Sequence, residues 1–419
     1  MFKITHNGEF EPASIELPIS KSIANRILAL NFSLQQAIDL GTDIPDDVKV
    51  LQSCFRKIKK PSNQDHVIID AQDAGTAFRI LTSALSFTPG LWVLKGSGRM
   101  HQRPIGDLVE ALNAAGANIE YTEERGFPPL TIHGRHAPKS FNTSIKAYRS
   151  SQYISSILLM APLFEDGIAL QVEGNVVSRP YIEMTLGILT QYGFKVSKET
   201  TGELSLIKIA EGKVGQRSMM RIEKDWSSSA FFYLLTAIGN YSDIKLPGLT
   251  PSQMQGDSAL SKLFQSIGVS STERLNEIEL QQTRPQQASL QINFTDIPDL
   301  APSLILACAV KGVSLRCLGM DHLRLKESDR IGAMNYNLKQ LGYSLEQSDK
   351  SFKLGKFGPL QEQLIFNSFD DHRMVMSFAM MAIIKPVYFD EIHCVSKSFP
   401  NFWIEMEKLG FKFEKVDGV

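Results

Sequence analysis

One stretch decides the fold: Leu108-Val109-Glu110-Ala111-Leu112-Asn113-Ala114-Ala115-Gly116-Ala117-Asn118-Ile119-Glu120-Tyr121. Its apolar side chains recur three and four residues apart, which predicts an amphipathic helix. Gly116 is expected to close this helix, because glycine adopts positive φ at little cost. The alternating residues after it predict a short, half-exposed strand.

The same helix–glycine–strand pattern returns along the chain. Further helices are predicted over 184–192, 260–267, 334–341 and 404–409, each followed closely by a glycine (Gly193, Gly268, Gly342, Gly410). The five glycines lie 68 to 77 residues apart, and a weaker helix over 48–58 precedes them. Six units of about 70 residues would fill the 419-residue chain, which indicates internal duplication. Three units in each of two similar halves would place the domain boundary near Asp225-Trp226.

Composition narrows the class of protein. Hydrophobic residues make up 43% and charged residues 21% of the chain, as in ordinary globular proteins, which excludes collagen, coiled coil and disorder. The net charge is −1, so the strong basic excess of a nucleic-acid-binding protein is missing. The longest apolar runs, 157–164 and 374–384, are too short to span a bilayer. No secretory signal is visible at the N-terminus, and a cytoplasmic location is expected.

Metal, redox and nucleotide motifs are not found. Cys54, Cys308, Cys317 and Cys394 match no zinc or redox spacing, so reduced thiols are expected. The chain has neither a phosphate-binding P-loop nor a dinucleotide fingerprint, and no H-x-x-x-H pair. A serine-hydrolase elbow is also missing.

Several predicted helices begin with small polar residues. These starts are Ser20-Lys21-Ser22 with Arg26, Ala74-Gly75-Thr76 with Arg79, Ser150-Ser151-Gln152, and Ser227-Ser228-Ser229. A helix N-terminus exposes unpaired N–H groups and attracts anions. Any one of these starts could be ordinary helix capping. Four of them, two with a nearby cation, favour anion binding.

Further cations and acids lie beside apolar or Gly/Pro segments. They fall in 99–107, 324–330, 370–374 and 396–400. Charge runs usually form a solvated helix face, but arginines in such surroundings suit phosphate and carboxylate ligands. Asp299 and Glu327 are the general acid/base candidates, with an N-cap and a salt bridge as their ordinary alternatives.

Together these motifs resemble the enolpyruvyl transferase family, and within it the branch that acts on shikimate 3-phosphate. The resemblance extends from Leu17 to Pro400, with its motifs in family order. They are Ser20-Lys21-Ser22, Ala74-Gly75-Thr76-Ala77, Arg103-Pro104-Ile105-Gly106-Asp107-Leu108, Ser150-Ser151-Gln152, Ser178-Arg179-Pro180-Tyr181, Ile297-Pro298-Asp299, Lys326-Glu327-Ser328-Asp329-Arg330, Asp371-His372-Arg373-Met374 and Lys397-Ser398-Phe399-Pro400.

The resemblance implies an α/β fold of two similar domains, each built from three βαβαββ units as an inside-out α/β barrel, with a central cleft that closes about a hinge. One domain would comprise 1–19 with 226–419 and carry the phosphoenolpyruvate and acid/base side. The other would comprise 20–225 and mainly bind shikimate 3-phosphate. The implied reaction transfers the enolpyruvyl group of phosphoenolpyruvate to the 5-hydroxyl of shikimate 3-phosphate, without metal or cofactor, in a monomer.

The resemblance also implies roles for individual residues. The catalytic residues would be Lys21, Asp299 as the base on the 5-hydroxyl, Glu327 as the proton carrier at C3, and His372 in support. Shikimate 3-phosphate would contact Lys21, Ser22, Arg26, Ser150, Ser151, Gln152, Ser178, Tyr181, Asp299, His322 and Lys326. Phosphoenolpyruvate would contact Lys21, Gly75, Arg103, Gln152, Arg330, Arg373 and Lys397.

The chain departs from the family pattern at a few positions. Ile19 replaces a usual Gly, Asp73 a common Asn, and Ile80 a frequent Pro, while His322 stands where some members have Asn. These departures are expected to affect the details of the pocket more than the reaction.

The sequence disfavours three alternatives. The sister enzyme that uses UDP-N-acetylglucosamine typically carries a reactive Cys where this chain has 95–100 without one, and lacks the Asp-His-Arg-Met element. A nucleic-acid enzyme resembling RNA 3′-phosphate cyclase is disfavoured by the neutral charge. A non-catalytic anion-binding relative is disfavoured because Lys21, Asp299 and Glu327 are all present.

Overall fold

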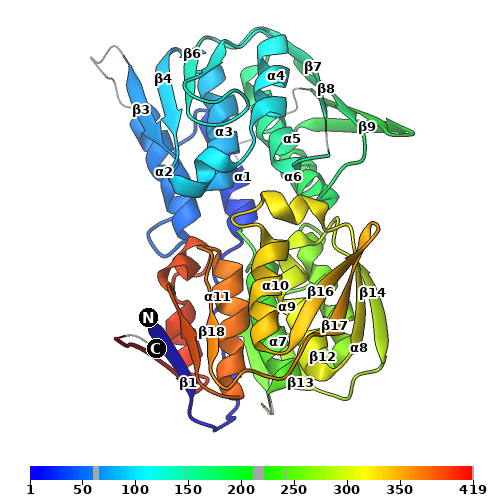
Figure 1. The fold of residues 1–419 in the computed structure, drawn as a ribbon. Coiled ribbons are helices and arrows are strands. Elements are labelled where there is room, and N and C mark those ends of the chain that lie inside the picture. Colours follow the sequence, from blue (N-terminus) through cyan, green and yellow to red (C-terminus); the bar gives the residue numbers. More distant parts are fainter. Residues whose placement is uncertain (60–65, 147, 211–220, 240, 242, 418–419) are drawn as a thin grey trace. The chain divides into compact units, whose positions relative to one another are not determined.

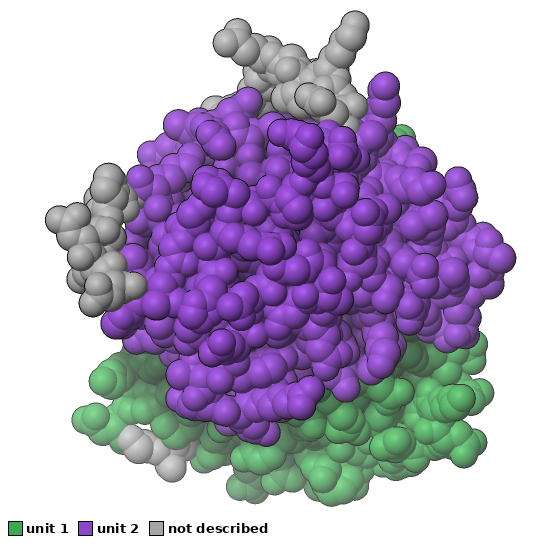
Figure 2. Space-filling view, turned by 90° about the horizontal axis from the view of Figure 1, so that it is seen from above, with its two compact units in different colours: residues 1–20, 223–419 green, residues 21–222 purple. Residues whose placement is uncertain are grey.

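A computed structural model describes residues 1–59, 66–146, 148–210, 221–239, 241 and 243–417. The chain divides into two compact units, coloured separately in Figure 2. Unit 1 comprises Met1–Ser20 and Glu223–Val419, and unit 2 comprises Lys21–Ile222. Each unit is described on its own.

Unit 2 contains two four-stranded sheets within its described residues, and both have the same strand order. In each, the first two strands are parallel and the last two join them antiparallel, so that the order is first, second, fourth, third. The sheets are β3(Val67–Asp70), β4(Gly90–Lys95), β6(Leu130–Gly134), β5(Ile119–Tyr121), and β7(Ser140–Lys146), β8(Gly167–Glu173), β10(Leu204–Ala210), β9(Lys195–Thr201).

Unit 1 has three four-stranded sheets in its described residues; two of them repeat this order, and in the third a strand from the start of the chain takes the place of the fourth strand. They are β14(Ser289–Asn293), β15(Ser314–Leu318), β17(Ser351–Lys356), β16(Tyr343–Ser348); β2(Ala13–Ser14), β11(Ile244–Pro247), β13(Glu277–Gln282), β12(Val269–Arg274); and β18(Leu364–Phe366), β19(Val387–Phe389), β1(Phe2–His6), β20(Phe411–Lys415). Two of these sheets take a strand from the start of the chain, because β2 pairs with β11 and β1 lies between β19 and β20.

The helices are of two kinds that alternate along the chain (Figure 1). The first helix of each repeat is buried almost all round: α1(Lys21–Ser33), α3(Gly75–Ser86), α5(Ser151–Leu158), α7(Trp226–Ile238), α9(Ala301–Lys311) and α11(His372–Ala379). The second helix exposes one face: α2(Asp46–Ile58), α4(Gly106–Ala114), α6(Arg179–Gln191), α8(Leu260–Ile267), α10(Arg330–Gln340) and α12(Phe402–Glu407).

This alternation explains the core of each unit. In unit 1 the buried helices α7, α9 and α11 contact one another, and in unit 2 α3 contacts both α1 and α5. A helix that is apolar all round must be enclosed, whereas an apolar stripe is enough for an outer helix.

The predicted α/β class and βαβαββ unit are confirmed. Short 3₁₀ helices complete the chain: η1(Gly98–Gln102), η2(Ala161–Leu163), η3(Gly256–Ala259), η4(Pro298–Leu300), η5(Asp321–Leu325), η6(Met380–Ile383) and η7(His393–Lys397).

The glycines of the repeat behave as predicted. All five have φ between 78° and 105° and lie between the predicted helix and strand. At Gly342, between α10 and β16, a β-carbon would also overlap the carbonyl oxygen of Gly358. Both the backbone conformation and the lack of space therefore require glycine there.

The structure also bears on the cysteines and on membrane-spanning helices. The four cysteines are buried free thiols, and burial raises the pKa of the Cys54, Cys308 and Cys317 thiols to about 12. No helix in the described part of the chain is both long and apolar enough to cross a membrane.

We predict that Gly342→Ala lowers the free energy of unfolding by about 1–3 kcal/mol, because alanine would be strained at positive φ. Gly187, in the interior of α6, has no atom within 4 Å of the position of a β-carbon. Gly187→Ala should therefore stabilise by about 0.5–1 kcal/mol. Urea unfolding followed by circular dichroism measures both changes. Equal effects of the two substitutions would contradict this account of the repeat.

Candidate active site

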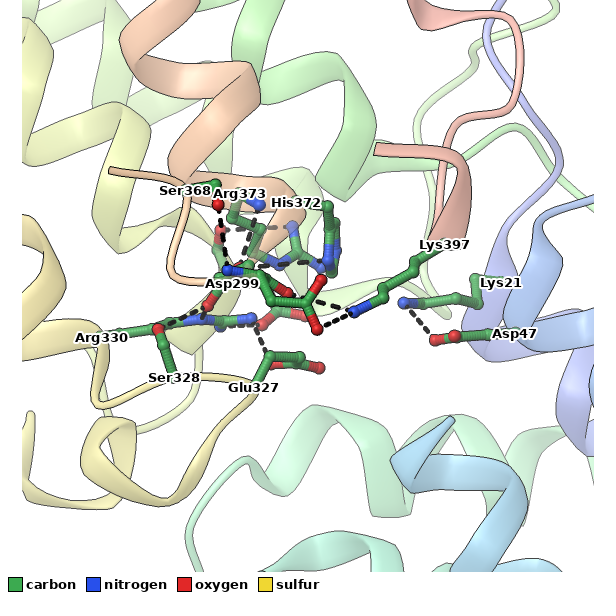
Figure 3. Close-up of polar contacts among 12 residues, drawn as sticks. Lys21, Asp47, Asp299, Glu327, Ser328, Arg330, Ser368, His372, Arg373 and Lys397 are labelled. Atoms are coloured by element: carbon green, nitrogen blue, oxygen red, sulfur yellow. Dashed lines mark hydrogen bonds and ion pairs between the residues drawn. The ribbon is translucent and has the colours of Figure 1, made fainter. Parts of the chain in front are cut away.

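The predicted acid/base residues of unit 1 surround one arginine (Figure 3). Arg330 is the first residue of α10, and its side chain is only 1% exposed. Nη1 donates to Asp299 Oδ1 at 2.8 Å, Nη2 to Glu327 Oε2 at 2.6 Å, and Nε to Asp371 Oδ2 at 2.9 Å. All three nitrogens of one guanidinium are thus paired with carboxylates.

The carboxylates of this cluster keep the central arginine charged. Burial alone would lower the pKa of Arg330, but Asp371, Glu327 and Asp299 outweigh it and raise the pKa well above its usual value. A buried charge is tolerated only when it is paired and hydrogen-bonded. The ordinary alternative for Glu327, a salt bridge, is therefore found in the structure.

Asp299 lies in η4, directly before α9, between two guanidiniums. Besides Arg330, Arg373 Nη2 donates to Asp299 Oδ2 at 2.8 Å. Burial alone would raise the pKa of Asp299, but Arg373, Arg330 and Lys326 outweigh it and hold the pKa well below the usual range. Asp299 is not the N-cap of α9, a position that Leu300 occupies.

Asp371 links the arginine cluster to the start of α11. Its Oδ1 accepts from the backbone N–H of Arg373 at 3.0 Å as the N-cap, while Ser328 Oγ donates to Oδ2 at 3.0 Å. His372 is buried at the first position of the same helix, with Nδ1 4.0 Å from Asp371 Oδ1. The carboxylate therefore fixes the helix start that carries Arg373.

Lys397, the last residue of η7, is bound by Asp370, which lies directly before the N-cap of α11. Its Nζ lies 2.9 Å from Asp370 Oδ2 and 3.2 Å from the carbonyl oxygen of Asp370. Phe369 and Asp370 both have positive φ, of 51° and 52°. Two consecutive non-glycine residues in the left-handed region indicate backbone strain, which gathers at functional sites.

His322 lies in η5 and is buried, with no hydrogen-bond partner for Nε2 among the described residues. Burial, with the charges of Lys326 and Arg330, lowers the pKa of His322 to about 3, although Asp299 and the Gly319 backbone raise it. The imidazole is therefore neutral near pH 7. If the other ring nitrogen donates to the Gly319 backbone, Nε2 is left as an unused acceptor.

In unit 2, Arg26 of α1 ties three helices together. Nε donates to Thr185 Oγ1 at 2.8 Å, and Nη2 donates to Ser155 Oγ at 3.1 Å and to the carbonyl oxygen of Tyr181 at 2.9 Å. Nη1 donates to the carbonyl oxygen of Ser22 at 2.9 Å. Burial lowers the pKa of Arg26 to about 10, so it remains charged near pH 7.

The start of α6 lies against the same arginine. The Tyr181 ring centroid is 5.8 Å from Arg26 Cζ. Ser178 precedes α6 with a φ of 55° and is 2% exposed, and its side chain makes no capping hydrogen bond. Ser178 and Tyr181 are thus brought to Arg26 as part of one arrangement.

The starts of α3 and α5 also lie together. Gln152 Nε2 donates to Thr76 Oγ1 at 3.1 Å, and Ser150 caps α5 by accepting from the N–H of Gln152 at 3.2 Å. Ser151 follows as the buried first residue of α5. Gly75 begins α3, and a β-carbon there would overlap the guanidinium of Arg103.

Arg103 is 5% exposed, and its Nε has no hydrogen-bond partner among the described residues. Such a donor beside a helix N-terminus is suited to an anion. Lys21, the first residue of α1, forms an ion pair with Asp47 of α2, with Nζ 2.9 Å from Oδ2. Both of these side chains are largely buried, at 14% and 15% exposed.

Sequence reasoning missed several partners. Asp47 could be recognised only as an acid in the first turn of α2, a common position for acids. Thr76 and Ser328 belong to the motifs named in the sequence analysis, but the motifs do not predict their hydrogen bonds with Gln152 and Asp371. Asp225, not the serines after it, caps α7 by accepting from the N–H of Ser228 at 3.2 Å.

The departures from the family pattern fit their surroundings. Ile19 forms an antiparallel bridge with Lys224, and such an extended backbone suits a β-branched residue. Asp73 accepts a hydrogen bond from Ser97 Oγ at 2.7 Å, and Ile80 is buried within α3. No glycine is needed at position 19.

Comparison with known proteins agrees with the motifs. The family model of EPSP synthase (3-phosphoshikimate 1-carboxyvinyltransferase) matches residues 34–406. A 3-phosphoshikimate 1-carboxyvinyltransferase of Bacteroides fragilis is 37% identical over 402 residues, which cover 95% of each chain. One from Cellvibrio japonicus is 31% identical and covers 93% of this chain and 95% of its own. An EPSP synthase structure from Acinetobacter baumannii has a TM-score of 0.75 at 23% identity, covering 99% of this chain and all of that one.

We predict that Arg330→Met lowers the free energy of unfolding by about 3–5 kcal/mol at neutral pH, because it leaves buried carboxylates unpaired. The folded-state pKa of Asp299 lies below its unfolded value, so its ion pairs stabilise the fold above about pH 4 and are lost as the pH falls further. The deficit relative to wild type should therefore shrink in acid. Urea unfolding from about pH 7 to pH 3 measures this trend.

Arg274→Met is the matched control. Arg274 pairs with Glu279 at 3.0 Å, but its side chain is 58% exposed. Its loss should cost less than about 1 kcal/mol. A deficit of this size for Arg330→Met, or one that did not vary with pH, would contradict the role of the cluster.

Proposed function

This chain belongs to the EPSP synthase family, and we propose that its two units divide the work of that family's reaction. The enzyme transfers the enolpyruvyl group of phosphoenolpyruvate to the 5-hydroxyl of shikimate 3-phosphate and releases phosphate. Unit 2 would mainly hold shikimate 3-phosphate. Unit 1 would supply the acid/base residues and the arginines that hold phosphoenolpyruvate.

Shikimate 3-phosphate is assigned to the start of α5 and its neighbours. The backbone N–H groups and serine hydroxyls there are donors for a phosphate group. Arg26 of α1, already hydrogen-bonded to α5 and α6, would hold this arrangement in place and add positive charge. The assigned residues are Lys21, Ser22, Arg26, Ser150, Ser151, Gln152, Ser178 and Tyr181, with Asp299, His322 and Lys326 of unit 1 for the ring hydroxyls.

Phosphoenolpyruvate is assigned to the remaining cations. Arg103 supports this assignment because it carries an unused buried donor beside the start of α3. Gly75 leaves room for the guanidinium of Arg103 against the start of α3. The assigned residues are Lys21, Gly75, Arg103 and Gln152 in unit 2, and Arg330, Arg373 and Lys397 in unit 1.

The ion pairs of unit 1 suggest how the base becomes active. Held between Arg330 and Arg373, the carboxylate of Asp299 binds protons too weakly to act as a base. A phosphoenolpyruvate carboxylate that takes over these guanidiniums would release both Asp299 and Glu327. Binding of phosphoenolpyruvate would thus restore the basicity of Asp299, which must remove the proton of the 5-hydroxyl of shikimate 3-phosphate.

The released groups then have distinct tasks. Asp299 takes the proton of the 5-hydroxyl while the hydroxyl oxygen bonds to C2 of phosphoenolpyruvate. Glu327, with Lys21, delivers a proton to C3. When phosphate leaves C2, C3 gives up a proton to Glu327 and the C2–C3 double bond is restored. His372 supports this side from the start of α11.

One observation supports these roles above the others: the carboxylates and guanidiniums assigned to unit 1 form a single hydrogen-bonded cluster. The family and its relatives favour shikimate 3-phosphate over UDP-N-acetylglucosamine as the acceptor. The monomeric state and cytoplasmic location stay predictions.

We predict that the purified protein releases phosphate only when shikimate 3-phosphate and phosphoenolpyruvate are both present. Inorganic phosphate is assayed with each substrate alone, with both, and with UDP-N-acetylglucosamine in place of shikimate 3-phosphate. Turnover with the nucleotide sugar but not with shikimate 3-phosphate would overturn the assignment.

We predict that Asp299→Asn lowers kcat by about 10²–10⁴-fold, the usual contribution of a general base. The KM for phosphoenolpyruvate should fall or stay constant, because the variant no longer competes for Arg330 and Arg373. Asp321→Asn, an exposed aspartate of η5, is the matched control and should retain wild-type kinetics. Near-normal turnover of Asp299→Asn would remove this residue from the mechanism.

A further inference from the structure

One buried tyrosine of unit 2 donates a hydrogen bond beside the residues assigned to phosphoenolpyruvate, and the roles described above do not use it. Tyr153 is the third residue of α5 and is 1% exposed. Its hydroxyl donates to the carbonyl oxygen of Pro104 at 2.5 Å. Burial raises the pKa of Tyr153 above its usual value, so the phenol stays protonated near pH 7 and keeps its donor.

Pro104 directly follows Arg103, and its carbonyl is held from two helices. Arg79 Nη2 of α3 donates to the same oxygen at 3.0 Å, and Arg79 Nη1 donates to the carbonyl oxygen of Gly75 at 3.2 Å. Proline has a fixed φ and no N–H group, so its carbonyl is the group through which side chains can hold this part of the backbone. The hydroxyl of Tyr153 and the guanidinium of Arg79 therefore fix Pro104 between α5 and α3.

The backbone is also anchored on the other side of Arg103. The N–H of Arg103 donates to the carbonyl oxygen of Met100 at 3.2 Å. Met100 Sδ in turn accepts from Arg79 Nη1 at 3.2 Å. Arg103 is thus held before and after its own position, and Tyr153 adds the anchor that comes from α5.

The side chain of Arg103 lies in a narrow space. A β-carbon at Gly75 would overlap its Nη1, so the guanidinium lies directly against the first residue of α3. Arg103 is 5% exposed, and its Nε has no hydrogen-bond partner among the described residues. A displacement of about 1 Å can forfeit much of a binding interaction, so the backbone that carries such a donor must be precisely placed.

We propose that Tyr153 is a positioning residue for Arg103: through the carbonyl of Pro104, its hydroxyl holds the guanidinium where a carboxylate–phosphate substrate meets the start of α3. The proposal rests on the assignment of Arg103 to phosphoenolpyruvate. No proton moves and no bond of the substrate changes in this role, so it belongs to binding and not to the chemical step. Loss of the hydroxyl should therefore raise the KM for phosphoenolpyruvate and spare kcat.

The ordinary alternative is a hydrogen bond that only stabilises the fold, and the chain offers a matched control for it. Tyr241 of unit 1 is 2% exposed, and its hydroxyl donates to the carbonyl oxygen of Leu409 at 2.5 Å. The two hydrogen bonds share their donor, the type of acceptor, their length and their burial. Neither Tyr241 nor Leu409 is assigned to a substrate, so Tyr241→Phe reports the effect of such a bond on the fold alone.

The first experiment measures KM and kcat by phosphate release in wild type, Tyr153→Phe and Tyr241→Phe, with each substrate varied in turn. In Tyr153→Phe we expect the KM for phosphoenolpyruvate to rise about threefold to tenfold, as for the loss of one hydrogen bond, while kcat and the KM for shikimate 3-phosphate stay within about twofold of wild type. Tyr241→Phe should keep wild-type kinetics.

The substitution at Tyr153 is mild, because the carbonyl oxygen of Pro104 keeps its hydrogen bond from Arg79 and is not left unpaired. Urea unfolding of both phenylalanine variants checks that they lose similar stability. An unchanged KM for phosphoenolpyruvate in Tyr153→Phe, or an equal rise in both variants, would overturn the proposal.

A second experiment tests whether Tyr153 acts through Arg103. Phospholactate carries the carboxylate and phosphate of phosphoenolpyruvate but has no double bond to which a hydroxyl can add. Calorimetry with shikimate 3-phosphate present therefore gives its Kd without turnover. Tyr153→Phe should weaken binding in the presence of Arg103 but by less than about twofold in an Arg103→Gln background, because two residues that act through one contact are not additive. Equal weakening in both backgrounds would mean that the hydroxyl acts on the fold at large, and would overturn the proposal.

The same titration separates this proposal from the proposed reaction. Weaker binding of phospholactate by Tyr153→Phe, in a protein that does not turn over, would count against the reaction alone. Equal binding by wild type and Tyr153→Phe would remove the positioning role even from an active enzyme.

Discussion

The buried guanidinium of Arg330 constrains everything around it. An arginine cannot shed its proton in a protein, so a side chain that is 1% exposed must be surrounded by anions. Those anions come from three places in the sequence: η4, the turn before α10, and the cap of α11. Because the charge of Arg330 must be neutralised, its ion pairs hold three segments of unit 1 together and place their acidic side chains around it.

The second constraint comes from the buried helices. Each unit encloses helices that are apolar almost all round, and their first N–H groups need partners at the ends where they emerge. Asp371, Asp225 and Ser150 each satisfy some of these groups by capping. Some candidate ligand-binding residues, such as Gly75, Ser151 and Arg373, also lie at the starts of buried helices, so the positions that need acceptors are also positions suited to phosphates and carboxylates.

The sequence was informative where the reason was local. The glycines of the repeat could be predicted because a helix that turns sharply into a strand needs positive φ at the junction. The residues of the candidate site were reached through motif resemblance, and the structure brings many of them into contact. Glu327 lies three residues before Arg330, so this ion pair is local, but Asp299 and Asp371 are far from Arg330 in sequence and nothing local indicates that they share this partner.

The placement of β1 affects how the chain can be made. This strand, Phe2–His6, pairs with β20, Phe411–Lys415, and the N-terminal nitrogen of Met1 donates to the carbonyl oxygen of Val416 at 2.9 Å. During synthesis on a ribosome, β1 cannot form this pairing until β20 has emerged. Unit 2 is continuous in sequence and has no such delay. The inserted unit can therefore acquire its structure on the nascent chain, while the unit that encloses Arg330 becomes complete only after β20 has been synthesised.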